Sequence, residues 1–309
     1  MAGEIISRPD LEAQEVSYPD FVGTKIYKWL PKSTIAGRVY FQDYHADVNP
    51  QYNRNQASLA DISDTVVASA SDTYSCAELR ARVKMSYAER ITGYQDDESA
   101  DLYMGRLAKR AYFNKIEQLC AGTLFDATGA ISGVADPVAT IDTNVSALRD
   151  LGYGRIALVG ANKNLVALKG NQTIADRMKN TGLGAYDLKE VRNVGWAQLG
   201  AALGVDEVLP MKDAIGYAGV SGSAKDCVAL VVLPDENLEP TEEVQLGRVI
   251  YYVFSGNEFD DRYCMESWVD APHDANVVDC KGLVQLKEFN PELRKTIRIF
   301  NNNSDSESL

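Results

Sequence analysis

The clearest pattern in this sequence of 309 residues is a long amphipathic segment over residues 96–125, DDESADLYMGRLAKRAYFNKIEQLCAGTLF. Apolar residues in it recur at spacings of mostly three or four, the period of a helix with one buried side. They are Ala100, Met104, Leu107, Ala111, Ile116, Leu119, Cys120 and Leu124. The pattern predicts a single helix of about 42 Å. Gly105 is its weak point, and Gly122 is predicted to end it.

The segments before this helix predict an arm and a long hairpin. Residues 1–35 are rich in Pro, Asp and Glu without sustained periodicity, which indicates an extended arm that needs a partner to lie on. Strand-forming residues follow at 36–44, and 72–86 is predicted to be the returning strand. The polar stretch 45–63 between them is too long for an internal connection of a compact domain, so we expect it to project onto a neighbouring subunit.

Short alternating units follow from about residue 140, and they predict a sheet covered by helices. The expected helices are 144–152, 163–178 and 195–204, and the expected strands among them are 155–160, 206–211 and 227–234. A run of strands comes next, at 244–254, 262–270, 275–289 and 295–301. The fold class predicted from these elements is α+β.

Composition narrows the classes of function. A formal charge of −13 and 45% apolar residues describe a chain with a large core that would not adhere loosely to nucleic acid or to an anionic membrane. The sequence MAGEIISRPDLEAQ has no basic and apolar leader pattern, and no stretch approaches the roughly 18 apolar residues of a membrane span. We therefore expect a cytosolic protein whose five widely spaced cysteines are reduced thiols.

Candidate chemistry is sparse. The two histidines, His45 and His273, are interpreted as solvated loop and turn residues, because neither has a facing partner at catalytic spacing. The loop GVSGSAKD at 219–226 lacks the pattern of a phosphate loop, and GxGxxG is absent. The acidic clusters at 94–101 and 259–263 are interpreted as a helix cap and a turn, without EF-hand spacing. No catalytic, cofactor or metal site is predicted.

Tyrosine is frequent, with 16 in the chain and many in the first third. Its amphipathic ring suits surfaces that become buried against a partner. Ordinary packing in the core and the sheets explains the same enrichment equally well. Both interpretations stay open at this point.

The order of arm, long β excursion, long helix and helix-covered sheet resembles the major capsid proteins of tailed phages, the HK97-like fold. The passage DTYSCAELRARVKMSYAERITGYQDDESADLYMGRLAKRAYFNKIEQLCAGTLF looks like that family's extension loop (E-loop) leading into its spine helix, with a late glutamate at Glu117. NKNLVALKGNQTIADRM with VGWAQLGAALGVDEVLPMKDAIGYAG is similar to the axial (A) domain, and NVVDCKGLVQLKEFNPELRKTIRIFN looks like the closing strands.

The resemblance implies a division of the chain. The ranges are an N-terminal arm at 1–35, an extension loop at 36–90, a peripheral (P) domain at 91–145 and 240–295 with the spine helix at 96–125, and an axial domain with the C-terminal tail at 146–239 and 296–309. It also implies inter-subunit contacts by the extension loop. Tyr40, Tyr44, Tyr52 and Arg54 are the residues predicted to make them.

The family implies a non-catalytic capsid protein that assembles with itself into hexamers and pentamers around double-stranded DNA, in a virion assembled in the host cytoplasm. The partners implied are a portal protein and either a separate scaffolding protein or none, and some shells of this kind add a decoration protein. Covalent crosslinking is not expected, because no lysine lies between Lys32 and Lys84. Two alternatives remain, an encapsulin-like compartment that encloses protein cargo and a monomeric enzyme that uses carboxylates.

Overall fold

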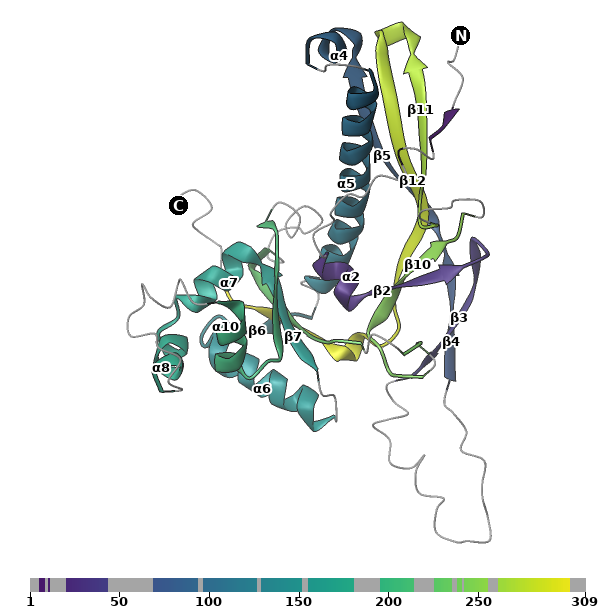
Figure 1. Cartoon of the computed structure of the whole chain (residues 1–309). Coiled ribbons are helices and arrows are strands. Elements are labelled where there is room, and N and C mark those ends of the chain that lie inside the picture. Colours follow the sequence, from purple (N-terminus) through teal and green to yellow (C-terminus); the bar gives the residue numbers. More distant parts are fainter. Residues whose placement is uncertain are drawn as a thin grey trace, which may run out of the picture.

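The structure is a computed structural model of the chain, and its described residues form two sheets, a separate hairpin and a long helix (Figure 1). The described residues are 6–8, 11, 21–43, 69–93, 97–126, 129–151, 155–180, 195–213, 225–234, 238–240, 242–254 and 261–300. The long helix and one sheet form the upright part of the molecule in Figure 1. The second sheet and its helices lie to one side of the helix's lower end.

The long helix α5 spans Asp97–Leu124, which confirms the predicted helix. Ala100, Met104, Ile116, Cys120 and Leu124 are all buried, as their spacing predicts. The structure corrects two details of this prediction. Leu119 is 46% exposed, and Gly122 does not end the helix. The helix continues for two residues beyond that glycine, because burial of Leu124 and Phe125 in the core outweighs the low helix propensity of glycine.

Polar residues also enter the buried side of α5. Lys109 and Glu117 are 1% and 3% exposed, although their residue type predicts solvent contact. The Lys109 ammonium lies 5.5 Å from the ring centre of Tyr263, a cation–π geometry. The buried side is therefore wider than the apolar stripe in the sequence.

The six-stranded sheet runs beside α5 along the upright part of the molecule (Figure 1). Its strands in spatial order are β1 (Ile6–Ser7), β11 (Cys264–Asp270), β12 (Ala275–Glu288), β10 (Gly247–Tyr252) and β2 (Lys28–Lys32), with β5 (Ala77–Ser86) on the other edge of β12. All neighbours are antiparallel except β10 and β2, which are parallel. The short helices α4 (Tyr87–Gly93), η2 (Ala271–His273) and η3 (Pro291–Leu293) lie at strand ends.

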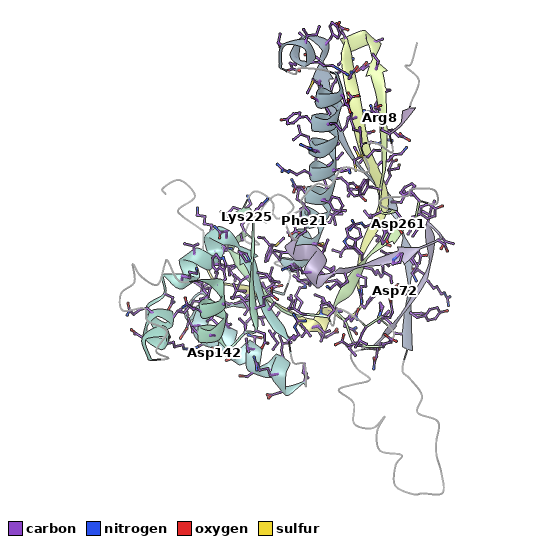
Figure 2. The ribbon with its side chains drawn as sticks, in the orientation of Figure 1. Arg8, Phe21, Asp72, Asp142, Lys225 and Asp261 are labelled. Carbon is purple, nitrogen blue, oxygen red and sulfur yellow. The ribbon has the colours of Figure 1, made fainter. Side chains whose placement is uncertain are left out.

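The hairpin consists of β3 (Ala36–Gln42) and β4 (Ser69–Ser75). The predicted return over 72–86 is therefore only half correct, because the chain leaves the hairpin at Cys76 and continues as β5, which pairs with β12. Two polar contacts fasten β4 to β12. Lys287 Nζ lies 2.6 Å from Oδ2 of Asp72, which Figure 2 labels, and the N–H of Ser75 donates to Gln285 Oε1 at 2.7 Å. The polar excursion at 45–63 lies outside the described residues.

The five-stranded sheet and its helices confirm the alternating units predicted after residue 140. Its strands in order are β6 (Ile131–Ser132), β13 (Arg294–Arg298), β9 (Cys227–Val232), β7 (Ile156–Ala161) and β8 (Glu207–Met211). The helices around it are α6 (Pro137–Asp150), α7 (Asn162–Lys169), α8 (Gln172–Asn180) and α10 (Trp196–Leu203). The one helix predicted over 163–178 is two, separated at Gly170. Helix α6 begins earlier than predicted, because the Asp136 carboxylate caps it by accepting from Val138 N–H and Ala139 N–H.

The predicted arm was expected to be extended and to lie on a partner chain. Its described part instead folds onto this chain's own body. Residues Val22–Ile26 form the helix α2, and the following strand β2 joins the six-stranded sheet. Ile26 and Tyr27 are fully buried in this chain's own core. Burial of these apolar side chains supplies the free energy that holds the segment in place.

Candidate functional site

The histidines show no catalytic arrangement in the part of the chain that the structure describes. His273 is 67% exposed in η2, and its Nδ1 lies 2.9 Å from Oδ2 of Asp270, three residues earlier. Asp274, the next residue in the chain, is not that partner. His45 lies outside the described residues. Nor do the described His, Cys, Asp and Glu side chains include any group of three that could hold a metal ion.

Two further features of the described residues concern the cysteines and the helices. All five cysteines are free thiols, and four of them are buried: Cys76, Cys120, Cys227 and Cys280. Within the described ranges, no helix is long and apolar enough to cross a membrane. Of the loop at 219–226, only Lys225 and Asp226 are described, directly before β9.

Of the four predicted inter-subunit residues, the structure describes Tyr40. Its side chain is 55% exposed on β3, whereas its neighbours Val39 and Phe41 are 1% and 8% exposed. The alternation follows from the pleat of a strand, which sends successive side chains to opposite faces. Tyr44, Tyr52 and Arg54 lie outside the described residues.

A second exposed apolar group lies at the upper end of α5 and of the six-stranded sheet. Tyr87 and Ile91 are 58% and 60% exposed and lie four residues apart on α4, so they share one face of that helix. The N–H of Tyr87 donates to the carbonyl of Asp274, which joins α4 to the turn between β11 and β12. Val269, near the end of β11, is 54% exposed. Of these residues, the sequence pattern indicated only Tyr87, as one of the many tyrosines in the first third of the chain.

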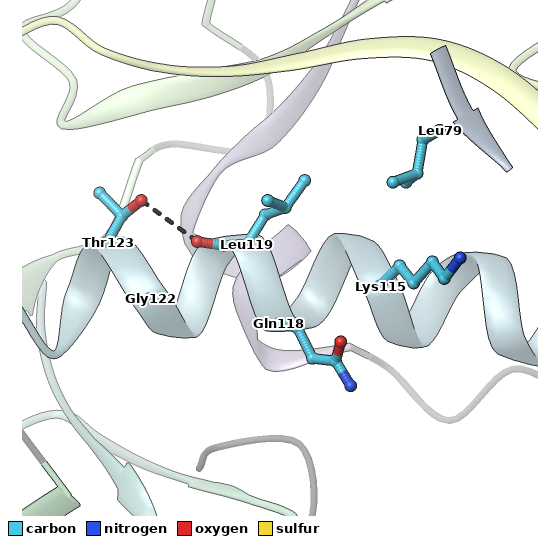
Figure 3. Close-up of a pocket in the computed structure, with 6 residues that line it drawn as sticks. All are labelled: Leu79, Lys115, Gln118, Leu119, Gly122 and Thr123. Carbon is cyan, nitrogen blue, oxygen red and sulfur yellow. Dashed lines mark hydrogen bonds between the residues drawn. The ribbon is translucent and has the colours of Figure 1, made fainter. Parts of the chain in front are cut away.

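The exposed Leu119 borders a groove of about 570 Å³ between α5 and the start of β5 (Figure 3). Leu79 from β5 faces it across the groove, and Gly122 leaves space beside it. Lys115 lies at the same side of the helix and donates from Nζ to the carbonyl of Arg80. The groove is therefore lined by both apolar and polar side chains.

Another groove, of about 460 Å³, lies among α6, α8 and α10 and contains two arginines. Arg177 Nη1 donates to Asp142 Oδ1 at 2.8 Å, and Arg149 Nη2 donates to the carbonyl of Gly204 at 2.8 Å. Both guanidinium groups are thus engaged by this chain. They hold the three helices together and neutralise the C-terminal end of α10.

The N-terminal segment contacts α5 at successive positions along its length. Arg8 Nη1 lies 2.7 Å from Asp101 Oδ2, and the fully buried Leu11 packs against Gly105. Further along, the ring of Phe21 stacks on Phe113 at a centroid distance of 5.7 Å. Figure 2 places Arg8 beside the upper part of the long sheet and Phe21 near the lower end of α5.

Helix α2 continues this contact at Glu117. The N–H of Gly23 donates to Glu117 Oε2 at 2.8 Å. A methyl group on Gly23 would lie 2.4 Å from Cβ of Cys120, so only glycine permits this approach. We call the α5 residues Asp101, Gly105, Phe113, Glu117 and Cys120 the arm-contact face.

The electrostatics at Glu117 are unusual for a carboxyl group. Burial raises its pKa from 4.5 to about 7, although the amides of Gly23 and Val22 and the charge of Lys212 act in the opposite direction. Burial, and to a smaller degree Glu117, raises the pKa of the neighbouring Cys120 thiol well above its usual range. The sequence showed a glutamate within an amphipathic helix, but not the segment that covers it.

Comparisons with known proteins identify the fold. No family model and no curated protein matches the sequence. Among solved structures, a phage-related protein from Bordetella bronchiseptica RB50 has a TM-score of 0.64 and 16% identity, over 96% of this chain and 98% of that one. The mature capsid of bacteriophage PhiM1 has a TM-score of 0.54 and 11% identity, over 95% of this chain and 90% of that one. The capsid of the cyanophage P-SCSP1u also has a TM-score of 0.54, with 10% identity over 94% and 92% of the two chains. The chain therefore has the α+β HK97-like fold, the fold of the tailed-phage major capsid proteins.

Proposed function

We propose that this chain is the major capsid protein of a tailed double-stranded DNA bacteriophage, which assembles into hexamers and pentamers of an icosahedral head. The observation that carries this proposal is the extent of the likeness. The match to the PhiM1 capsid covers 95% of this chain and 90% of the capsid chain. The shared architecture thus accounts for nearly the whole of both chains, and the role proposed for it is structural and non-catalytic.

The distribution of exposed apolar side chains supports a chain that binds copies of itself. Tyr40 on the hairpin, Tyr87 and Ile91 on α4, and Leu119 beside the groove lie on separate parts of the molecule. Rings form when one patch on a subunit meets a different patch on the next. Several modest contacts of this kind, repeated over a shell, give a durable assembly through avidity.

The domain assignment is part of the same proposal. In it, the arm is 1–35, the extension loop 36–90, the peripheral domain 91–145 and 240–295, and the axial domain with the tail 146–239 and 296–309. Tyr40, Tyr44, Tyr52 and Arg54 of the extension loop contact the neighbouring subunit. A portal protein, a scaffolding protein and a decoration protein are the partners that such a shell requires or accepts.

Charge fits the enclosed DNA of this proposal. A net charge of −13 disfavours tight binding to phosphate, so the shell encloses DNA without reading its sequence. Weak binding to the inner wall lets the DNA be packed without adhering to the shell. In this proposal the shell assembles in the host cytoplasm and becomes part of the virion.

Size-exclusion chromatography with negative-stain microscopy tests the proposal. Expressed alone or with the neighbouring genes of its source, the chain should give rings or polyhedral particles far larger than its 33.9 kDa. A single species of monomer size under all conditions would contradict a shell protein and favour the enzyme alternative. Particles isolated from the source that hold protein cargo, with no DNA, would favour the encapsulin-like compartment.

A further inference from the structure

Helix α2 lies where the N-terminal arm contacts both α5 and the second sheet. It contacts α5 through Gly23 and reaches β8 of the other sheet, where Lys25 Nζ lies 3.8 Å from Oε1 of Glu207. The Lys25–Glu207 pair is about 40% exposed, so it contributes little to holding the helix. The buried hydrogen bond from Gly23 N–H to Glu117 Oε2 attaches α2 to α5 itself.

We propose that the contact between α2 and Glu117 is a pH-sensitive latch, which holds the N-terminal arm on α5 when the carboxyl is neutral and loosens when it is ionised. The latch is a property of the single chain, and it goes beyond the proposed capsid function. Its closed state is the described structure, with Glu117 3% exposed and Cys120 fully buried beneath Gly23. Its open state is α2 lifted from α5, with both side chains in water.

The groups that face Glu117 define the electrostatics of the latch. From α2 they are the backbone amides of Val22 and Gly23, which favour the ionised form. From α5 the nearest titratable group is Cys120, whose raised pKa keeps its thiol neutral. The charged group that acts on Glu117 is Lys212, directly after β8, and it also favours ionisation. Burial outweighs these three influences together, because the carboxyl is removed from water on every side.

The direction of the pH effect follows from linkage. In the closed state the pKa of Glu117 is about 7, and in water a glutamate has its ordinary pKa of 4.5. Closing therefore takes up a proton between these two values, so the closed state loses population as pH rises through this window. Above about pH 8 the carboxyl is ionised in both states, so the ratio stays constant. Between pH 5 and pH 8 the ratio of closed to open molecules should fall on the order of 50-fold.

Alkylation of Cys120 measures opening, because α2 covers its thiol in the closed state. The purified chain is treated with N-ethylmaleimide at pH 5, 6, 7 and 8, and modification of each cysteine-containing peptide is followed by mass spectrometry. The matched variant is Glu117→Gln, which accepts the same amide hydrogen bonds and does not titrate. Dividing the wild-type rate by the variant's rate at each pH removes the pH dependence of the thiol itself. We expect this ratio to rise on the order of 50-fold from pH 5 to pH 8.

Two controls make the outcome decisive. Gly23→Ala should expose Cys120 at every pH, because the added methyl would overlap its side chain. Cys280, fully buried in β12, should stay protected in all three proteins. A wild-type to Glu117→Gln ratio that is constant with pH would overturn the latch. So would equal modification of Cys120 and Cys280, since the whole fold would then be opening.

Discussion

The side chain of Leu11 packs into the space that Gly105, which has no side chain, leaves on α5. Leu11 is fully buried, and a methyl group on Gly105 would lie 3.3 Å from Cδ2 of Leu11. The glycine that is the weak point of α5 in terms of helix propensity is therefore the site where the N-terminal segment packs against it. Arg8 and Asp101 add an ion pair one turn away.

Leu11→Ala should lower the free energy of unfolding by about 2–4 kcal/mol, because it leaves a cavity over Gly105. Urea denaturation followed by circular dichroism measures the change. Leu119→Ala is the matched control, since that leucine is 46% exposed and should change stability by about 0.5 kcal/mol or less. Equal effects of the two substitutions would show that the N-terminal segment does not pack on α5 in solution.

Phe41→Ala should detach the hairpin from the body of the molecule. Phe41 stacks on Phe289 with ring centres 4.7 Å apart, and both rings belong to a small cluster with Leu30 and Ile250. Loss of this buried ring should lower stability by about 3 kcal/mol. Compared with the wild type, amide hydrogen exchange in the variant should speed up more in β3 and β4 than in β12. Unchanged protection of the hairpin would contradict the packing in the structure.

Tyr40→Ala should weaken assembly and leave the stability of the fold unchanged. This prediction rests on the proposed shell function. Tyr40 points away from the cluster that buries Phe41, so its loss should leave the free energy of unfolding within about 0.5 kcal/mol. An exposed tyrosine at a subunit contact contributes on the order of 1–2 kcal/mol, which corresponds to a roughly tenfold higher concentration for assembly. Light scattering against protein concentration measures that threshold. An unchanged threshold would show that Tyr40 does not contribute to the subunit contact.

Gly282→Ala should destabilise the packing of α5 against the sheet. A methyl group at Gly282 in β12 would lie 2.0 Å from the Tyr112 hydroxyl and 2.7 Å from the carbonyl of Arg262. We expect a loss of about 2–3 kcal/mol, measured by urea denaturation, because a tyrosine ring and a backbone group must both move. Gly93→Ala is the control. Nothing lies within 4 Å of its added methyl, so stability should stay the same or rise slightly. Equal tolerance of the two substitutions would contradict the close approach of α5 and β12.

Local patterns predicted the elements well. The helix at 96–125 and the units after residue 140 appear because their periodicities of about 3.6 and 2 reflect which side of each element is buried. The pairing of β5 was missed, because residues 77–86 have no local signal that distinguishes β3 from β12 as a partner. Among the candidate site residues, the structure describes only Tyr40, whose exposure is what alternation along a strand predicts. Its contact with a neighbouring subunit stays a prediction.

By itself, the sequence determined the order and type of the elements, the scarcity of histidine and the strongly acidic charge. Only the tertiary structure decided which side chains of α5 are exposed to solvent at each point along its length. Glu117 is buried and Leu119 is exposed, against their residue types, because Gly23 covers the first while an open groove separates the second from Leu79 of β5. Burial at such positions depends on segments about a hundred residues away in the chain, which no local periodicity records.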